Sequence, residues 1–515
     1  MKECTVAAAA VIKESKMGLS KLRILIPAVF ALFALQAIAH DTPTGMHIST
    51  KSQQAHVLFE KGMDKMEMLH IEDGLTNFRN SVKADPQFAL GHIILMFFSQ
   101  DPTEQVAERE QALATRATAN AEESLIIDWL ANASQSRSIP AIQAMNEALE
   151  KFPHDKHLHW LAGWWLLVDH NQSQRAVAMF ERVMQIDPKF ADAYNEAAYC
   201  YARMGNFDKA FTDIKRYTEL VPNEPNPQDT FAEISRMAGR FEDALTHYRM
   251  SLKIDPSFHE SQLGLGDTYA LMGQEERARE EYTKAIATGS PVQKVLWSLQ
   301  SAATWVREGN LAGADNAFNA VAAQAHEKDF ANLESEAYRS MSLYQLDGAA
   351  SLRLLAKAEA VLKEDHKVPQ ALLNEELASV LRTRVERALQ DNNKEVAATA
   401  FKRLEELAAN NGADGLIETS MHAASGAKAL AESNYADAVN HYEEDDSNAI
   451  SMRNLILAYE KNGQEGNARR LAAKLASLNV PLIEQAVVVP EFRKQRAAMA
   501  AKSNPALDPR AKYLK

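Results

Sequence analysis

The chain has 515 residues, 46% of them hydrophobic, and its formal net charge at pH 7 is −13. This apolar fraction is that of a folded protein and excludes a mainly disordered chain. The negative charge disfavours general binding to nucleic acid, because phosphates repel an acidic protein. The chain has only 20 glycines and 17 prolines, and helix-forming residues are abundant, which favours helices over strands.

Residues 1–39 have the three-part organisation of a secretory signal peptide. Lys21 and Arg23 precede an apolar run, and that run ends in small residues up to Ala39. We therefore expect cleavage near His40 and an exported protein, either periplasmic or secreted.

Two alternatives remain open at this end of the chain. Met17 is a possible true start, because residues 1–16 fit poorly as the basic region of a signal peptide. The segment from Leu22 to Ala39 is also near the shortest length that spans a bilayer, about 17 residues. An uncleaved N-terminal membrane anchor is therefore the alternative to cleavage.

Helical pairs are predicted from residue 55 onward, after an N-terminal linker at residues 40–54. The helix–turn–helix rhythm is clear in residues 55–88, weak in residues 89–121 and clear again in residues 122–156. Each clear unit closes with a proline, which ends a helix because it has no N–H to donate.

The clearest repeats span residues 157–290, where three markers recur with a spacing of 34 residues. The markers are a glycine at Gly205, Gly239 and Gly273, an alanine at Ala176, Ala210, Ala244 and Ala278, and a proline at Pro188, Pro222 and Pro256. Three markers in one register indicate a repeated structural unit.

Each marker has a physical reason. Gly205 ends the first helix of its unit, because glycine tolerates the left-handed conformation of a helix C-terminus. Ala210 is small where the two helices of the pair approach each other closely. Pro222 ends the second helix. One pair cannot bury its own apolar faces, so neighbouring pairs must stack.

These units resemble the tetratricopeptide repeat (TPR), a 34-residue helix–turn–helix. The family's series of aromatic and small residues is met by Trp160, Trp164, Leu167, Ala176, Phe180, Val183 and Pro188, and in the next unit by Tyr194, Ala198, Tyr201, Ala210, Ile214, Tyr217 and Pro222. Trp164 departs from the pattern, which has a small residue there. The resemblance implies an all-α fold, an α-solenoid of stacked TPR-like repeats.

The domain organisation follows from where these signatures occur. Residues 55–290 are predicted to form the TPR solenoid, and residues 291–480 are predicted to form degenerate TPR-like helical repeats. Residues 481–515 are interpreted as a C-terminal cap and tail. We expect about twelve helical pairs in all.

The predicted binding site lies on the first helices of residues 157–290. In the family a second stripe of each first helix faces the concave surface, and 3.6 residues per turn places this stripe roughly 140° from the buried one. The residues selected in this way are Leu161, Trp165, Asp192, Asn195, Tyr199, Arg203, Asn226, Asp229, Glu233, Arg236, Glu260, Leu263 and Asp267. Aromatic side chains and carboxylates together suit an extended basic or apolar segment of another protein. The alternative is a solvated acidic face that binds nothing.

No catalytic, cofactor or metal site is expected. His154, His157 and His159 are close in sequence, but on a helix they point apart. Gly264 and Gly266 match only the start of a dinucleotide loop. They fall in the first helix of a repeat, where Gly266 takes the small position.

The resemblance therefore implies a non-enzymatic scaffold for protein–protein interaction, in envelope assembly, chaperoning or regulation. Its partner is expected to be another protein or peptide and not nucleic acid, and any membrane contact is expected only through an uncleaved anchor. Two other functions remain open, an accessory subunit of an envelope enzyme (or an unrecognised enzyme) and a structural, self-assembling envelope protein.

Overall fold

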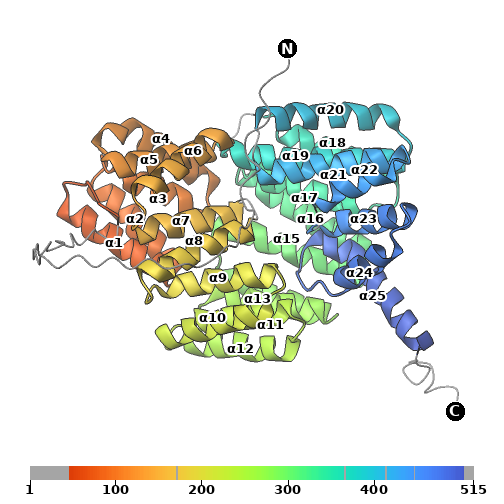
Figure 1. Cartoon of the computed structure of the whole chain (residues 1–515), viewed down its shortest axis with the longest axis horizontal. Coiled ribbons are helices and arrows are strands. Elements are labelled where there is room, and N and C mark those ends of the chain that lie inside the picture. The colour runs from red at the N-terminus through yellow and green to blue at the C-terminus, as the bar shows by residue number, and fades with distance from the viewer. Residues whose placement is uncertain (1–45, 170–171, 365–366, 412–413, 446, 504–515) are drawn as a thin grey trace, which may run out of the picture. The chain divides into compact units, whose positions relative to one another are not determined.

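The computed structural model describes residues 46–169, 172–364, 367–411, 414–445 and 447–503. These residues form 25 α-helices and no strand, so the fold is all-α, as the sequence predicts (Figure 1). None of these helices is long and apolar enough to cross a membrane. The predicted signal peptide lies outside the described residues.

The helices up to residue 308 carry the clearest sequence repeats. They are α1 (Gln53–Glu67), α2 (Ile71–Ala84), α3 (Ala89–Phe98), α4 (Pro102–Thr115), α5 (Ala121–Ala133), α6 (Ser138–Lys151), α7 (Lys156–Trp164), α8 (Ser173–Ile186), α9 (Ala191–Arg203), α10 (Phe207–Leu220), α11 (Asn226–Met237), α12 (Phe241–Ile254), α13 (His259–Leu271), α14 (Glu275–Thr288) and α15 (Pro291–Glu308). A 3₁₀ turn at Arg116–Thr118 follows α4, and a π-helical turn at Trp165–Asp169 continues α7.

The remaining helices continue the same pattern of pairs. They are α16 (Leu311–Glu327), α17 (Ala331–Tyr344), α18 (Gly348–Val361), α19 (Gln370–Gln390), α20 (Lys394–Asn410), α21 (Gly415–Ala431), α22 (Tyr435–Glu443), α23 (Ala449–Lys461), α24 (Glu465–Ala476) and α25 (Ile483–Ser503). In the described part of the chain, α1 to α24 form twelve pairs, and α25 follows as a single helix.

The repeat markers occupy the places predicted for them. Gly205, Gly239 and Gly273 each follow a first helix with φ of +77°, +76° and +75°, a conformation that glycine adopts without strain. Ala210 has no exposed surface, and α10 packs against α9. The local signals therefore specify both the ends of the helices and the contact within a pair.

Neighbouring pairs stack through contacts between a second helix and the next first helix, and also through contacts between first helices. The first helices of successive pairs contact one another, for example α9 with α11, α11 with α13 and α15 with α17. Each second helix contacts its own partner and the first helix of the next pair, as α8 does with α7 and α9. The first helices therefore share one face, which we call the first-helix face.

The hydrophobic core runs along the stack instead of forming one centre. One cluster extends from Phe59 in α1 to Ile234 in α11, and a second extends from Val292 in α15 to Ala486 in α25. Such a core is expected of a repeat protein, since each pair buries its apolar surface only against its neighbours.

The C-terminal helix lies on the first-helix face of the later pairs. The helix α25 contacts α15, α17 and α23, which are all first helices, as well as α24. Arg339 of α17 pairs with Glu376 of α19 at 2.9 Å and with Glu484 of α25 at 3.3 Å. Part of the segment interpreted as a cap and tail is therefore a helix that covers this face.

Candidate protein-binding surface

The structure divides the thirteen predicted site residues into two groups. Eight are buried, namely Leu161, Trp165, Asp192, Asn195, Asn226, Asp229, Arg236 and Asp267. The other five keep accessible surface, namely Tyr199, Arg203, Glu233, Glu260 and Leu263. The angular argument placed all thirteen on one face, but it did not distinguish buried from accessible positions.

The buried polar residues bond the first helices of successive pairs to one another. Trp160 of α7 donates its indole N–H to Asp192 of α9 at 2.6 Å. Asn195 donates to the other oxygen of Asp192 at 3.1 Å, and Thr230 of α11 donates to Asn195 at 2.6 Å. Three helices are thereby connected by hydrogen bonds that water does not reach.

The same arrangement continues through the next pairs. Ser261 of α13 donates to Asp229 of α11 at 2.6 Å. Arg236 pairs with Glu233 at 2.7 Å and with Asp267 of α13 at 3.5 Å, and Tyr282 of α14 donates to Asp267 at 2.5 Å. We call this set of bonds, from Trp160 to Tyr282, the polar ladder. It fixes the spacing and rotation of the first helices, since buried polar groups tolerate few alternative geometries.

Burial changes the charge of the ladder. It raises the pKa of Asp192 to about 7 and the pKa values of Glu196 and Asp229 well above their ordinary range. Desolvation disfavours the ionised carboxylate, so these groups keep a proton to higher pH than ordinary carboxyl groups do. The buried carboxyl groups therefore carry less negative charge than the sequence predicts. Glu233 and Glu260 remain as the accessible carboxylates of the site.

The five accessible residues lie on α9, α11 and α13, the helices that the ladder joins, and we call them the accessible row. Tyr199 of α9 donates to Glu233 of α11 at 3.1 Å, and Arg203 donates to the carbonyl of Leu167 at 3.0 Å. Glu260 is exposed to water, yet protein atoms surround it closely enough that desolvation raises the pKa of its carboxyl.

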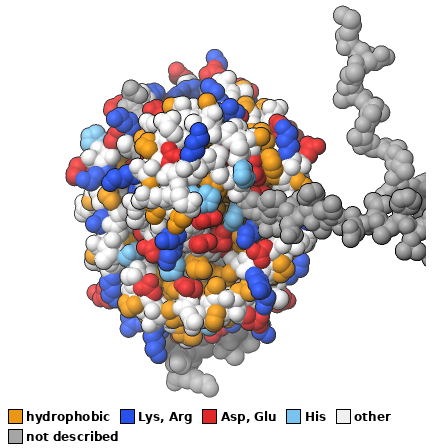
Figure 2. All heavy atoms as spheres, turned by 90° about the vertical axis from the view of Figure 1, so that its left-hand side faces the viewer, with side chains coloured by type: hydrophobic (Ala, Val, Ile, Leu, Met, Phe, Trp, Pro, Cys, Tyr) orange, Lys and Arg blue, Asp and Glu red, His pale blue; other side chains and the backbone are white. Residues whose placement is uncertain are grey.

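Histidine–carboxylate pairs connect the first pair of helices to later ones. Glu67 of α1 pairs with His157 of α7 at 2.9 Å, and His70 pairs with Glu224 at 2.8 Å. Figure 2 shows acidic, basic and histidine side chains gathered near the middle of one face, on the side that lies to the left in Figure 1. No sequence pattern predicted these pairs, because 154 residues separate His70 from Glu224.

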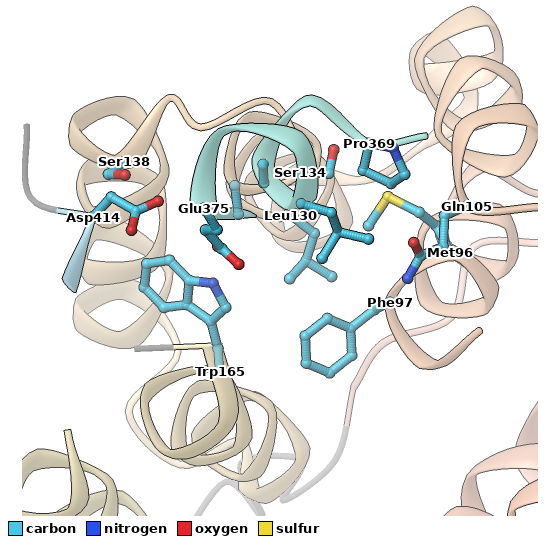
Figure 3. Close-up of a pocket in the computed structure, with 13 residues that line it drawn as sticks. Met96, Phe97, Gln105, Leu130, Ser134, Ser138, Trp165, Pro369, Glu375 and Asp414 are labelled. Carbon is cyan, nitrogen blue, oxygen red and sulfur yellow. The ribbon is translucent and has the colours of Figure 1, made fainter. Parts of the chain in front are cut away.

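Trp165 has a different role from the one predicted. It is 2% exposed and lines a cavity of about 140 Å³ together with Met96, Phe97, Leu130 and Glu375, among others (Figure 3). The start of α19 forms one wall, and the backbone N–H of Ala371 donates to the carbonyl of Ser134 at 3.2 Å. A cavity of this size is too small for a peptide, so Trp165 does not extend the accessible row.

The glycine and histidine motifs have structural roles. Gly266 lies within α13, and a Cβ atom there would lie 2.8 Å from the ring of Tyr282, so it is a packing position, as expected. Gly264 is a second such position, where a Cβ atom would lie 2.2 Å from the ring of Tyr248. His159 bonds the backbone carbonyl of Asp155, whereas His157 bonds Glu67. Among the described residues, no three His, Cys, Asp or Glu side chains are placed to hold a metal ion.

Stacked helix–turn–helix pairs with a shared first-helix face define an α-solenoid repeat protein. More narrowly, the chain contains tetratricopeptide repeats. Two family models, each described as a tetratricopeptide repeat, match residues 167–229 and 236–292. The matches fall on the block with the clearest 34-residue spacing, and repeats of this kind form protein-interaction scaffolds.

More distant similarities are confined to parts of longer proteins. Superkiller complex protein 3 of Mus musculus is 24% identical over 115 residues, which is 22% of this chain and 7% of that protein. Superkiller protein 3 of Schizosaccharomyces pombe is 21% identical over 223 residues, which is 42% of this chain and 16% of that protein. The chain thus matches less than a fifth of either relative.

A comparison with solved structures also finds similar chains. The crystal structure of the APC/C hetero-tetramer Cut9–Hcn1 is 14% identical in sequence, with a TM-score of 0.39. The alignment covers 82% of this chain and 76% of the other chain.

Proposed function

We propose that this protein is a non-catalytic scaffold that binds an extended segment of another protein along the accessible row. The observation that carries this proposal is the position of the row on helices joined by the polar ladder. A surface held by buried hydrogen bonds loses little conformational entropy when it binds, because its side chains and helices are already ordered.

The chemistry of the row suggests what the bound segment contains. Tyr199 and Leu263 offer apolar area, and Glu260 offers a carboxylate in surroundings that are partly desolvated. A segment with an apolar residue and a Lys or Arg residue complements these groups. Arg203, which is held by the carbonyl of Leu167, adds a cation at the end of the row and favours an acidic or carbonyl group there.

A displayed library of random peptides, selected on the purified full-length protein, tests this proposal. Peptides enriched by the wild type should lose binding to the double variant Glu260→Lys with Leu263→Asp. The matched control is Glu280→Lys with Met250→Asp, which makes the same kinds of change on the second helices α14 and α12, where both residues are exposed. The control variant should keep the enriched peptides.

Two outcomes contradict the proposal. If the row variant retains the enriched peptides while its circular dichroism matches the wild type, the row is not the binding surface. If both variants lose the peptides, the loss of binding is not specific to substitutions in the accessible row. Trp165 and Asp229 are unsuitable for this test, because both are buried and their replacement would perturb folding.

We further propose that the scaffold is exported and acts in the cell envelope, in assembly, chaperoning or regulation. The support is the basic-then-apolar pattern that ends at Ala39. Edman sequencing of the protein recovered from cells that express the full chain should give His40 as the first residue. An intact Met1 or Met17 would instead support an N-terminal anchor.

A further inference from the structure

The cavity of about 140 Å³ that Trp165 lines is a candidate site for a small molecule (Figure 3). Its walls come from α3, α4, α5, the π-helical turn after α7, and the start of α19. The backbone N–H of Ala371 donates to the carbonyl of Ser134 at 3.2 Å, so the walls are bonded to each other across the cavity. A cavity of this size has room for about one aromatic ring.

Much of the cavity lining is apolar. Figure 3 shows the rings of Trp165 and Phe97 pointing into the cavity. Met96 and Leu130 are buried and extend this apolar part of the lining. Phe97 and Leu372 keep some accessible surface, so the cavity lies close to solvent and a small molecule can reach it.

One buried acceptor in the lining has no donor. The Nε2 atom of Gln105 donates to the carbonyl of Ser99 at 2.7 Å, and this bond fixes which end of the amide is the oxygen. The Oε1 atom of Gln105 is buried and has no hydrogen-bond partner among the described residues. Figure 3 shows this amide turned towards the cavity. A buried acceptor without a donor costs free energy, so a ligand that donates a hydrogen bond here would recover it.

The charged groups of the lining favour a cation. Glu375 and Asp414 contribute carboxyl groups, and none of the described residues that line the cavity is a lysine or an arginine. One oxygen of Asp414 accepts from the backbone N–H groups of Leu416 and Ile417, both at 3.1 Å, so this carboxyl group is held in place. The face of an aromatic ring such as that of Trp165 also attracts a cation.

We propose that this cavity binds a small organic ammonium ion, a protonated amine on an apolar group about the size of one aromatic ring. The ammonium group donates to the Oε1 atom of Gln105 and lies on the side of the carboxyl groups of Glu375 and Asp414. The apolar group packs against Trp165 and Phe97. The cavity shares no residue with the accessible row, so its test is independent of the one proposed above.

A bound ammonium ion would also connect distant parts of the stack. Gln105 belongs to α4 and Glu375 to α19, and these residues contact the same ligand in the proposed complex. Anything that binds only the closed arrangement of two elements stabilises that arrangement. The ligand should therefore slow amide hydrogen exchange at the start of α19, in residues 371–375.

The experiment measures binding of three small probes to the purified full-length protein by saturation-transfer nuclear magnetic resonance. Benzylamine is a cation at neutral pH, benzyl alcohol has the same size without the charge, and benzoate is an anion. Benzylamine should bind saturably and at least about 10-fold more tightly than benzyl alcohol, because a charged donor makes the stronger hydrogen bond. Benzoate should not bind saturably, because it has no donor for Gln105 and the carboxyl groups repel it.

Recognition by Gln105 has its own variant. Gln105→Leu keeps the approximate size of the side chain but removes the acceptor, so benzylamine should bind at least about 10-fold more weakly. The matched control is Gln111→Leu, at an exposed position of the same helix α4, which should bind benzylamine as the wild type does. Equal binding by the two variants overturns the assignment of Gln105.

The place of binding is tested by filling the cavity. Ala371→Leu adds a larger side chain to the lining and should abolish binding of benzylamine and its effect on hydrogen exchange in α19. The control Ala398→Leu makes the same change at an exposed position of α20 and should bind as the wild type does. If Ala371→Leu does not fold, Ala133→Leu in the α5 part of the lining replaces it.

Three outcomes overturn the proposal. Absence of saturable binding by any probe would show that the cavity holds water only. Binding of benzoate or benzyl alcohol as tight as that of benzylamine would show that the cavity does not select an ammonium ion. Binding of benzylamine that survives in a folded, cavity-filled variant would show that the probe binds elsewhere on this acidic protein.

Discussion

The indole N–H of Trp160 and the carboxylate of Asp192 lie 2.6 Å apart, and neither side chain has any exposed surface. The two residues belong to the first helices α7 and α9 of successive pairs. A buried indole N–H requires an acceptor, and a buried carboxylate requires donors. This hydrogen bond therefore connects two repeats, and it satisfies one buried polar group from each of them.

Replacing Asp192 tests the energetic role of this bond. Asp192→Ala leaves the N–H of Trp160 unpaired, so the free energy of local opening of α9 should fall by about 1–3 kcal/mol. Asp192→Asn keeps an acceptor and should cost less. Amide hydrogen exchange in α9 measures the effect, with Asp208→Ala on the exposed side of α10 as the control. Equal exchange in Asp192→Ala and wild type would show that the bond contributes nothing.

The same substitution should have opposite effects at two glycines in helices. A Cβ at Gly264 would lie 2.2 Å from the ring of Tyr248, so Gly264→Ala should destabilise the fold by about 1–3 kcal/mol. At Gly466 in α24 the nearest atom is the end of Arg470 at 3.7 Å. Gly466→Ala should therefore stabilise by about 0.5–1 kcal/mol through helix propensity. Urea unfolding followed by circular dichroism measures both changes, and a loss of stability at both positions contradicts this account.

The stability of the protein should depend on the titration of Glu275. This carboxyl is 9% exposed, and burial raises its pKa to about 7 from 4.5 although Arg307 and Arg279 lower it in part. The folded state therefore holds a proton that the unfolded state releases between pH 4.5 and 7. The contribution of this proton to the free energy of unfolding is complete below pH 4.5 and is lost as the pH rises towards 7.

The variant Glu275→Gln isolates this effect, because its amide does not titrate. Relative to this variant, the free energy of unfolding of the wild type should fall by about 1–3 kcal/mol between pH 4.5 and pH 7. Urea titrations at several pH values measure the difference. A difference that does not change with pH would show that Glu275 has the same pKa in both states.

Arg339 should control the attachment of α25. Its guanidinium forms ion pairs with Glu376 and Glu484. Removing the guanidinium would leave both carboxylates without this counter-ion in a largely buried site. Arg339→Ala should cost about 3–5 kcal/mol and raise hydrogen exchange in residues 483–497. Arg353, which is 71% exposed, provides the control Arg353→Ala with little effect. Unchanged exchange in α25 would show that apolar packing alone holds this helix.

The local part of the fold could be predicted because its causes are local. Gly205 and Pro222 end helices for reasons confined to their own backbone, and Ala210 marks a contact between helices only a few residues apart. The 3.6-residue period likewise needs only the sequence of one helix to group residues into stripes. None of these features depends on the distance between neighbouring helical pairs.

The division of that face into buried and accessible residues could not be predicted in the same way. Asp192 and Tyr199 lie on the same stripe, yet Asp192 is fully buried because Trp160 of the preceding pair reaches it, whereas Tyr199 keeps accessible surface. Trp165 looked like the end of a groove, but the start of α19 covers it. Burial depends on the packing distance between helices, and the periodicity of a sequence carries no information about that distance.

The sequence by itself thus determined the helical pair and its repetition, since helix capping and periodicity act within about 34 residues. Only the tertiary structure decided which polar groups form the ladder and what covers the first-helix face. The bond between Ser49 and Glu123 joins residues 74 apart, and Arg339 and Glu484 are 145 apart. Such contacts form only after the stack has brought distant segments together, and a single sequence carries no local signal for them.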